Sequence, residues 1–439
     1  MLVTMLRSVF PRLLSAAAAP FRVPAMVVAL AFVQIALPVA ILATGSHQAW
    51  ADDDDDDDDD RPRRRVIIEQ RQQPVTPRRE ARRPARTALE FVAYLPTGTS
   101  PVILQQAGFV ITGRRAVGAL GRDLVRLRSI RRESTEAALR RLRAITPVGL
   151  ADRNRIYRPS RFDCSAAGCG AFAMIDWPNP PTTCPVEATI GMIDTAVDAA
   201  HPAFRQGAVE VLTVRAPDRG PSSDRHGTAV AALLVGQADS EHPGLLPRAR
   251  LVSVDVFHRG GDGRDVTDTF DLVGGLDALM ARGIRIANLS LSGPDSPLLR
   301  EAVEAAIGRG MVLVAAAGNE GPAARPLYPA AYAGVIAVTA VDRDGRVFRR
   351  ANRGNHIAFA APGVNLVLAE TRGRARPQSG TSFAAPFVTA AASLVTRSGA
   401  AGVDAVVDAL RKAATDIGAP GRDPLTGWGL IRRPAACTS

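Results

Sequence analysis

The sequence predicts an α/β protein in which a small α+β unit of ferredoxin-like order precedes a doubly wound parallel sheet. From about residue 185 onwards, short apolar stretches alternate with helical patterns, as in sheets whose parallel strands are joined by helices. Those apolar stretches are rich in Val, Ile and Ala and carry few charges, which is typical of strands covered on both faces. Residues 88–158 instead follow the order β-α-β-β-α-β.

In the small unit, 88–158, the first strand is predicted at 89–94, where apolar residues dominate. A short helix over 100–107 follows, and then strands at 109–111 and 124–127, the second with alternating apolar and charged residues. Residues 134–145 predict an amphipathic helix, because Ala138, Leu139, Leu142 and Ile145 share one stripe. A last extended piece reaches Tyr157.

In the larger unit, 185–439, we predict six strands and five helices from the alternation of apolar runs and helical periodicity. The strands are expected at 188–193, 209–214, 251–257, 284–291, 311–316 and 335–341. The helices are expected at 226–235, 267–281, 297–308, 382–395 and 403–414. Ligand sites in such sheets lie at the carboxyl ends of the strands.

The charge of the chain is distributed unevenly. A net charge of +11 suggests nucleic-acid binding, but residues 61–160 carry 23 Arg against seven acidic residues, whereas residues 161–439 carry 28 basic and 27 acidic ones. Residues 52–60 are all Asp, and we expect 52–87 to form a disordered linker. A nucleic-acid role would rest on the Arg-rich segment alone and would be sensitive to salt.

Residues 1–51 have the features of an export signal. An apolar run over 23–43 follows three Arg residues, and Ala49-Trp50-Ala51 supplies an A-x-A cleavage site. An uncleaved membrane anchor is the alternative, although Pro24, Gln34 and Pro38 weaken a spanning helix. We therefore expect export to the periplasm or the medium and no stable membrane insertion after cleavage.

The cysteine content fits an exported protein, because four cysteines can form two disulfides: Cys164, Cys169, Cys184 and Cys437. Three pairings are possible. The short loop between Cys164 and Cys169 favours that pair, which would leave Cys184 with Cys437. A metal site is the competing interpretation, but neither a Cys-x-x-Cys nor a matching His spacing is present.

Three residues far apart in the sequence suggest nucleophilic catalysis. Ser382 follows Gly380-Thr381 at the start of a predicted helix, where free N–H groups favour negative charge. His226 also opens a helix, and Asp194 ends a strand. A serine hydroxyl needs a base, and the base needs a third group to orient it. We predict Ser382 as nucleophile, His226 as base and Asp194 as its orienting acid.

Asn319, in Ala316-Ala317-Gly318-Asn319-Glu320-Gly321, is the predicted fourth member of the site. A tetrahedral intermediate carries a negative oxygen that needs hydrogen-bond donors. The side-chain amide of Asn319 and the backbone N–H of Ser382 are the expected donors of this oxyanion hole.

These motifs together resemble the subtilisin-like (subtilase) serine protease family. The resemblance rests on Ile193-Asp194-Thr195, His226-Gly227-Thr228, Ala317-Gly318-Asn319 and Gly380-Thr381-Ser382 with Ala384-Ala385-Pro386, and it spans about 185–433. It implies a serine endopeptidase for polypeptide substrates that needs no cofactor for its chemistry. It also implies that 88–158 is an inhibitory and folding-assisting propeptide, and that 159–184 is a linker in which the chain cuts itself.

The resemblance further implies where the substrate lies. Ser290-Leu291-Ser292-Gly293 would pair with the substrate backbone as an added strand, and Ala316, Ala317 and Gly318 would line the pocket for the side chain before the scissile bond. Ser292 and Leu327 stand where the family usually has smaller residues. We therefore expect a narrow pocket that favours small or medium apolar side chains.

Several alternatives were weighed against this assignment. A pseudoprotease would lack one of the four groups, and an esterase would more often carry a Gly-x-Ser-x-Gly turn, which is absent around Ser382. Many subtilases bind calcium, and the best candidate segment in this sequence is 262–271. We expect that segment to be a solvated start of a helix instead. We expect a monomer inhibited by its own propeptide.

Overall fold

The apolar strands of the larger unit form one seven-stranded parallel sheet in the computed structural model, which describes residues 90–159, 170–178, 188–371 and 374–435. The spatial order is β15-β14-β13-β11-β6-β8-β7. The strands are β6 (Thr189–Asp194), β7 (Val209–Thr213), β8 (Arg250–Asp255), β11 (Ile286–Leu289), β13 (Val312–Ala316), β14 (Val335–Val341) and β15 (Ile357–Pro362). The predicted export signal, the Asp/Arg-rich linker and all four cysteines lie outside the described residues.

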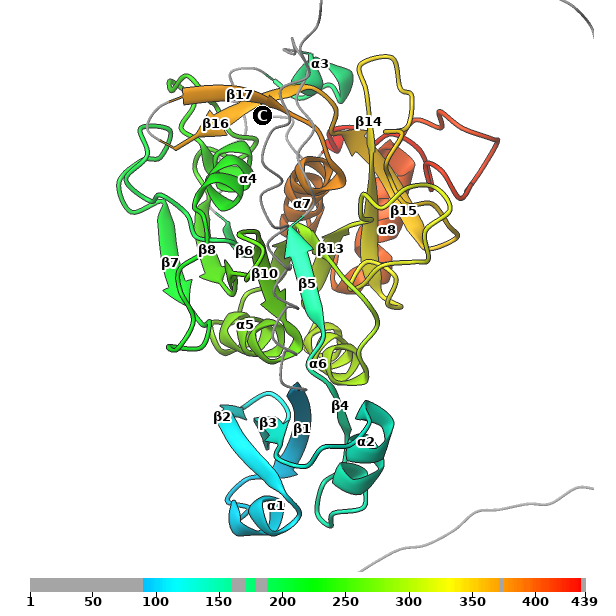
Figure 1. Cartoon of the computed structure of the whole chain (residues 1–439). Coiled ribbons are helices and arrows are strands. Elements are labelled where there is room, and N and C mark those ends of the chain that lie inside the picture. Colours follow the sequence, from blue (N-terminus) through cyan, green and yellow to red (C-terminus); the bar gives the residue numbers. More distant parts are fainter. Residues whose placement is uncertain (1–89, 160–169, 179–187, 372–373, 436–439) are drawn as a thin grey trace, which may run out of the picture. The chain divides into compact units, whose positions relative to one another are not determined.

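Helices cover both faces of this sheet, so the predicted doubly wound α/β fold is confirmed (Figure 1). One face packs against α4 (Arg225–Val235), α7 (Thr381–Arg397) and α8 (Gly402–Ala413). The other face packs against α5 (Thr269–Ala281) and α6 (Pro297–Gly308). Because both faces are buried, the strands can be continuous runs of Val, Ile and Ala, as in β14, where every residue is buried.

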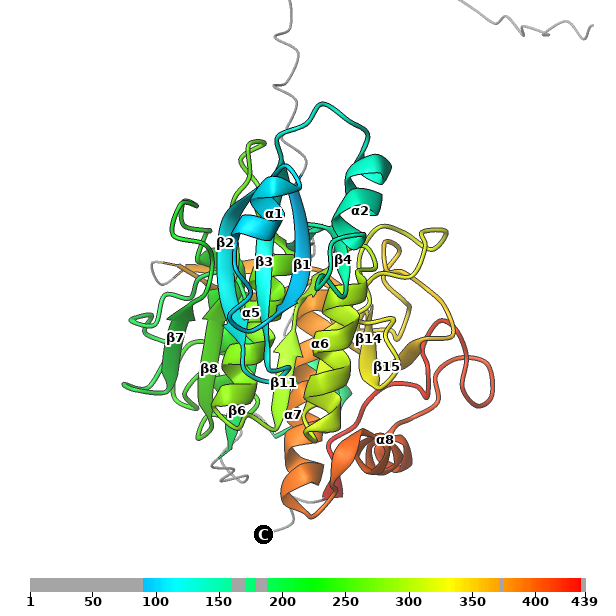
Figure 2. The same ribbon diagram turned by 90° about the horizontal axis from the view of Figure 1, so that it is seen from below.

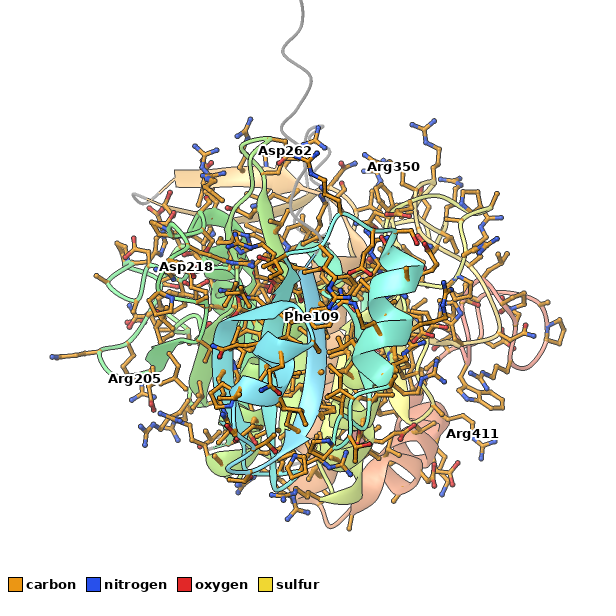
Figure 3. All side chains as sticks on the ribbon, turned by 60° about the horizontal axis from the view of Figure 1, so that its bottom comes forward. Phe109, Arg205, Asp218, Asp262, Arg350 and Arg411 are labelled. Atoms are coloured by element: carbon orange, nitrogen blue, oxygen red, sulfur yellow. The ribbon has the colours of Figure 1, made fainter. Side chains whose placement is uncertain are left out.

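The small unit has the predicted ferredoxin-like order, with an antiparallel sheet in the spatial order β2-β3-β1-β4. Its own apolar core contains Phe109, labelled in Figure 3, with Phe91 packed edge to face against it. The Ser134 hydroxyl caps α2 by accepting the Ala137 N–H at 3.2 Å. The elements are β1 (Glu90–Pro96), α1 (Val102–Gln106), β2 (Phe109–Val117), β3 (Arg122–Ser129), α2 (Thr135–Arg143) and β4 (Ala151–Arg153).

The N-terminal sheet, β1 to β4, packs on α5 and α6 of the larger unit, and Figure 2 shows β1 to β3 lying over these helices. The Tyr94 hydroxyl donates to the carbonyl oxygen of Leu298 at 3.1 Å. The Arg115 guanidinium lies 4.1 Å from the centre of the Phe270 ring and pairs with Asp271 at 2.8 Å. A half-buried cation that both stacks on a ring and pairs with a carboxylate makes this contact specific as well as apolar.

The predicted solvated start of the helix within 262–271 is wrong for its second half. Asp262 is exposed, but Asp268 and Asp271 are fully buried. Asp268 accepts the Asp271 N–H at 3.1 Å as the N-cap of α5, and it also pairs with Arg219. The charges are tolerated because each carboxylate has an arginine partner, which a sequence pattern could not indicate.

A single extended segment links the two units. It is β5 (Ile156–Pro159), which lies antiparallel between β12 (Leu291–Ser292) and β10 (Asp265–Asp268), while β9 (His258–Arg259) pairs with the far edge of β10. The labels of Figure 1 mark β5 beside β10. Asp262, labelled in Figure 3, adds an ion pair with Arg158 at 3.8 Å. The larger unit therefore holds this segment as an added strand.

Part of the predicted processing linker packs against the large core. Helix α3 (Ala171–Met174) and Trp177 contact the cluster formed on the α4–α7 face, and the Trp177 indole donates to the carbonyl oxygen of Leu245 at 3.0 Å. A two-stranded ribbon of β16 (Leu366–Glu370) and β17 (Arg374–Gln378) lies next to α4. None of the described helices is both long and apolar enough to cross a lipid bilayer.

Candidate active site

The carboxylate of Asp194 lies at the carboxyl end of β6, where a parallel sheet offers its ligand side. Its side chain is buried, and Oδ1 accepts two hydrogen bonds, one from the Thr195 N–H at 2.7 Å and one from Nδ1 of His226 at 2.6 Å. The short distance between two buried groups is typical of a charge-assisted hydrogen bond. Asp194 therefore fixes the ring of His226 and leaves Nε2 as the nitrogen available for chemistry.

Gly227 brings the start of α4 onto the loop after Asp194. A Cβ at this position would lie 2.5 Å from the carbonyl oxygens of both Thr195 and Ala196. The Gly227 N–H instead donates to the Thr195 hydroxyl at 2.9 Å. Only glycine permits this approach, and the approach sets the distance between His226 and Asp194.

Replacing Gly227 with Ala should reduce kcat/KM by roughly 10 to 100-fold, because a small shift of His226 away from Asp194 is costly for catalysis. Steady-state hydrolysis of a chromogenic peptide measures the effect, and a thermal melt separates it from unfolding. Gly220→Ala is the matched control, since a Cβ at Gly220 meets no atom within 4 Å. Full activity of the Gly227 variant would show that the close contact does not set the catalytic geometry.

Ser382 lies in the first turn of α7, where a proline four residues later removes one helical hydrogen bond. Pro386 has no N–H, so the carbonyl oxygen of Ser382 lacks its usual helical donor. The Ser290 hydroxyl takes that role, donating to Ser382 O at 2.7 Å. In this structure the Ser382 hydroxyl in turn donates to the carbonyl oxygen of Ser290 at 2.9 Å. The start of α7 is therefore locked to the end of β11.

The serine segment and the histidine helix are in contact. The ring of Phe383, the residue after Ser382, lies 5.5 Å from the ring of His226, and α4 and α7 pack against each other. The elements carrying Asp194, His226 and Ser382 thus meet at one edge of the sheet. Nucleophilic attack requires the Ser382 hydroxyl to turn from Ser290 O towards the imidazole, an adjustment that is common in unliganded sites.

The side chain of Asn319 is oriented by the residue before Ser382. Its Oδ1 accepts from both the N–H and the hydroxyl of Thr381, each at 3.1 Å. Its Nδ2 is buried and has no hydrogen-bond partner among the described residues. A buried amide donor without a partner costs stability, and such groups concentrate where function needs them. Sequence reasoning missed the role of Thr381, although its position beside Ser382 could have indicated it.

Of the seven residues predicted to bind substrate, Ser292 and Leu327 line a cavity of about 640 Å³ beside Asn319. A Cβ on Gly318 would lie 2.6 Å from Cδ1 of Leu327, so these two residues are in contact. The lining also includes Gly293 of the predicted substrate-binding segment, and residues that sequence reasoning did not assign to substrate: Arg264, Pro294, Glu320, Gly321 and Arg350. Arg350 is labelled in Figure 3.

The other five residues predicted to bind substrate do not line this cavity but lie in the framework around it. Ser290 holds the start of α7, and Leu291 is buried in β12, opposite Pro159 of β5. Ala316 and Ala317 are buried at the end of β13, and Gly318 donates its N–H to the Thr381 hydroxyl at 3.1 Å. These residues form the frame behind Asn319 and beside β5.

Leu327→Ala should broaden the accepted side chains, because it removes three carbons from the wall of this cavity. We expect the preference for Phe over Ala before the scissile bond to increase by about tenfold in kcat/KM. Cleavage of a peptide library by the parent and the variant measures it. A parent enzyme that already prefers bulky aromatic or Arg residues would refute the narrow pocket.

Within the described residues, no three His, Cys, Asp or Glu side chains are grouped to hold a metal ion. The buried acids of the 262–271 segment have arginine partners instead. The side chains gathered at this site are the hydroxyl of Ser382, the imidazole of His226, the carboxylate of Asp194 and the amide of Asn319.

Comparison with known proteins agrees with this arrangement. The sequence model described as "Subtilase family" matches residues 187–429, more than half of the chain. The chain is 33% identical over 216 residues to "Minor extracellular protease Epr" of Bacillus subtilis, a match that covers 48% of this chain and 33% of that protein. It is 32% identical over 255 residues to "Subtilisin" of Bacillus pumilus, covering 56% of this chain and 90% of that protein.

Among solved structures, fervidolysin from Fervidobacterium pennivorans, a keratinolytic enzyme related to subtilisin, has a similar fold. The TM-score is 0.66 at 20% sequence identity, and the match covers 80% of this chain and 61% of that one. The structural similarity thus extends beyond residues 187–429.

Proposed function

The chain belongs to the subtilase family, and on that premise we propose that it is an exported serine endopeptidase made as a self-processed precursor. The observation that carries the proposal is the buried hydrogen bond between Asp194 Oδ1 and His226 Nδ1 at 2.6 Å, beside the helix that begins with Ser382. An imidazole oriented in this way is the base that a serine nucleophile requires.

The proposed reaction runs through an acyl-enzyme. The Ser382 oxygen attacks the peptide carbonyl while its proton passes to Nε2 of His226. The new oxyanion accepts hydrogen bonds from Asn319 Nδ2 and the Ser382 N–H. The intermediate collapses as His226 gives the proton to the leaving amine, and water then hydrolyses the ester by the same path. Asp194 stabilises the imidazolium in both steps, and the reaction uses no cofactor.

Labelling with a fluorophosphonate tests this function. The reagent should form a covalent adduct on Ser382 in the purified protein, identified by peptide mass spectrometry, and casein should be hydrolysed. A folded protein that neither labels nor cleaves casein would be a pseudoprotease. A protein that labels and hydrolyses only short-chain esters would be an esterase.

The position of β5 supports self-processing between Pro159 and Gly170. Pro159 pairs with Leu291 and Arg158 with Ser292, so the chain runs along the predicted substrate-binding segment towards the cavity beside Asn319. On the other side, α3 and Trp177 are packed on the large core. The scissile bond is therefore proposed within 160–169, and the mass of the mature form would identify it.

The side chain of Tyr157 anchors the segment that precedes this bond. It is fully buried, and a Cβ on Gly293 would lie 2.3 Å from its ring. The N-terminal sheet adds the contacts with α5 and α6, which hold 90–159 on the larger unit while β5 pairs with β12 in the uncut chain. We infer that this unit remains as an inhibitor after cleavage until it dissociates.

Release of the cut N-terminal unit should depend on pH through Asp271. Burial, together with the charge of Asp268, raises the pKa of Asp271 to about 7 while Arg115 covers it. Release of the unit removes Arg115, which lowers this pKa, but it also lets water reach Asp271, and we expect the loss of burial to return the pKa towards its ordinary value near 4. Asp271 therefore binds its proton more tightly when the cut N-terminal unit is bound than when it is released. This contribution to the stability of the bound state is fully present below about pH 4 and is lost as the pH rises through 7.

We therefore expect the cut unit to dissociate at least about tenfold faster at pH 8 than at pH 5.5. Size-exclusion chromatography of the processed protein over a pH series measures the release. Asp271→Asn, which cannot titrate, should flatten the dependence, and an unchanged pH dependence in that variant would assign it to other groups.

Export, disulfides and monomeric state are parts of the same proposal. The name of Epr describes an extracellular protease, and the sequence contains a predicted export signal and four cysteines. Intact-mass analysis of the secreted form, with and without reduction, would give the mature N-terminus and the number of disulfides. A thermal melt with added calcium tests for a structural calcium ion.

A further inference from the structure

Three neighbouring strands of the large sheet end together at the proposed catalytic edge. In the order β6-β8-β7, Asp194 of β6 is paired in register with Asp255 of β8, and Asp255 with Thr213 of β7. Arg215 follows β7 by two residues. Two carboxylates and one guanidinium from distant parts of the sequence are therefore brought to one site, and the catalytic scheme uses only Asp194.

The second carboxylate is bound from three sides. Oδ2 of Asp255 pairs with Nη1 of Arg215. Oδ1 accepts the Ser222 hydroxyl at 3.1 Å and the Phe257 N–H at 3.2 Å. The Asp255 side chain is only 3% exposed and that of Arg215 is 19% exposed, so water screens the pair weakly.

Ser222 connects this carboxylate to the loop of the catalytic acid. Its Oγ accepts the N–H of Ala196 at 2.9 Å while it donates to Asp255. Ala196 lies two residues after Asp194, and its carbonyl oxygen forms part of the contact with Gly227. The hydrogen-bond chain Asp255–Ser222–Ala196 thus supports the loop on which both Asp194 and His226 depend.

The charges of Asp255 and Arg215 lie close enough to Asp194 to affect the catalytic pair of Asp194 and His226. Burial raises the pKa of Asp255, Arg215 lowers it, and the charge of Asp194 raises it further. A further acid, Asp265 of β10, interacts electrostatically with both members of the catalytic pair, Asp194 and His226. Arg215 therefore offsets part of the rise in the pKa of Asp255 that burial and the charge of Asp194 cause.

We propose that Asp255, Arg215 and Ser222 act as positioning residues for the catalytic pair. Ser222 fixes the loop after Asp194, and the Arg215–Asp255 ion pair holds Ser222 while adding no net charge behind His226. This inference rests on the proposed protease function. Substitutions that leave peptidase activity measurable distinguish a wrong positioning role from a wrong function.

Truncating Ser222 tests the geometric part. Ser222→Ala removes the link between Ala196 and Asp255, and we expect kcat to fall about tenfold with little change in KM, because the substrate segment is untouched. Ser222→Thr keeps the hydroxyl and should restore most of the activity. A Ser222→Ala enzyme with kcat within twofold of the parent would overturn the positioning role.

Neutralising Asp255 tests the electrostatic part. Asp255→Asn keeps an acceptor for Ser222 but leaves the charge of Arg215 unbalanced, so protonated His226 is disfavoured. We expect the acid limb of the kcat/KM profile to move to lower pH by about 0.5 to 1 unit. The double variant Asp255→Asn with Arg215→Gln restores neutrality and should return the limb to the parent position.

Glu210→Gln is the matched control, because it also removes one carboxylate from the β7 region but belongs to an exposed pair with Arg282. Its acid limb should not move. If Asp255→Asn leaves the limb unshifted in a folded, active enzyme, the inference is wrong while the protease function stands. If the Asp255 variant does not fold, the Ser222 variants decide. A parent protein without peptidase activity would contradict the function itself.

Discussion

Replacing Ser382 with Ala should leave the chain folded, uncut and inactive. The hydroxyl is the proposed nucleophile for substrate and for the chain's own bond within 160–169, and without it the remaining groups have no covalent path. Turnover should fall by roughly 10⁴ to 10⁶-fold, as expected when the nucleophile of such a triad is removed. The fold should survive, because the carbonyl oxygen of residue 382 still accepts from Ser290.

Intact-mass analysis of the purified variant, expressed alone, measures the outcome. Ser393→Ala is the matched control on the same helix, since its buried hydroxyl only bonds the Thr389 carbonyl oxygen at 2.9 Å. That control should be processed as the parent is. Appearance of the mature band in the Ser382 variant would mean that another protease cuts the chain, and self-processing would be refuted.

Asn319→Ala should lower kcat by roughly 10² to 10³-fold with KM nearly unchanged, because the amide donates only to the oxyanion of the transition state. The loss should appear in single-turnover acylation as well as in steady-state hydrolysis. The structural basis for this expectation is that Nδ2 is buried and has no hydrogen-bond partner in the part of the chain that the structure describes.

A second substitution separates donation from packing. Asn319 also accepts two hydrogen bonds from Thr381, and Asn319→Asp keeps that acceptor while replacing the donor by a negative oxygen. It should therefore be at least as impaired as the Ala variant. Recovery of kcat in the Asp variant would show that Asn319 serves Thr381 rather than the oxyanion.

Local patterns identified the elements whose signals lie within a few consecutive residues. The bounds of α6 were predicted because Pro297 begins the helix, and those of β14 because six apolar residues and one threonine follow a turn. The four site residues could be predicted because each catalytic role demands one residue type beside a glycine or at the end of an apolar run.

Other elements were missed because their residues have no local signature. Strand β15 is short, Ala-rich and ends in Pro362, and the ribbon of β16 and β17 alternates without a clear apolar face. Strand β5 was foreseen only as an extended piece. Its place between β10 and β12 depends on backbone pairing with residues more than one hundred positions away.

The sequence by itself determined the fold class and the family, and it predicted which residues serve as nucleophile, base, acid and amide, since these follow from periodicity and from the chemistry of short motifs. Only the tertiary structure decided that Asp268 and Asp271 are buried in ion pairs with arginines. It also decided that Asp255, paired with Arg215, lies beside Asp194 on the neighbouring strand. The physical reason is strand order: β6, β8 and β7 are neighbours in the sheet, and hydrogen bonding between strands, which no local pattern encodes, brings their ends together.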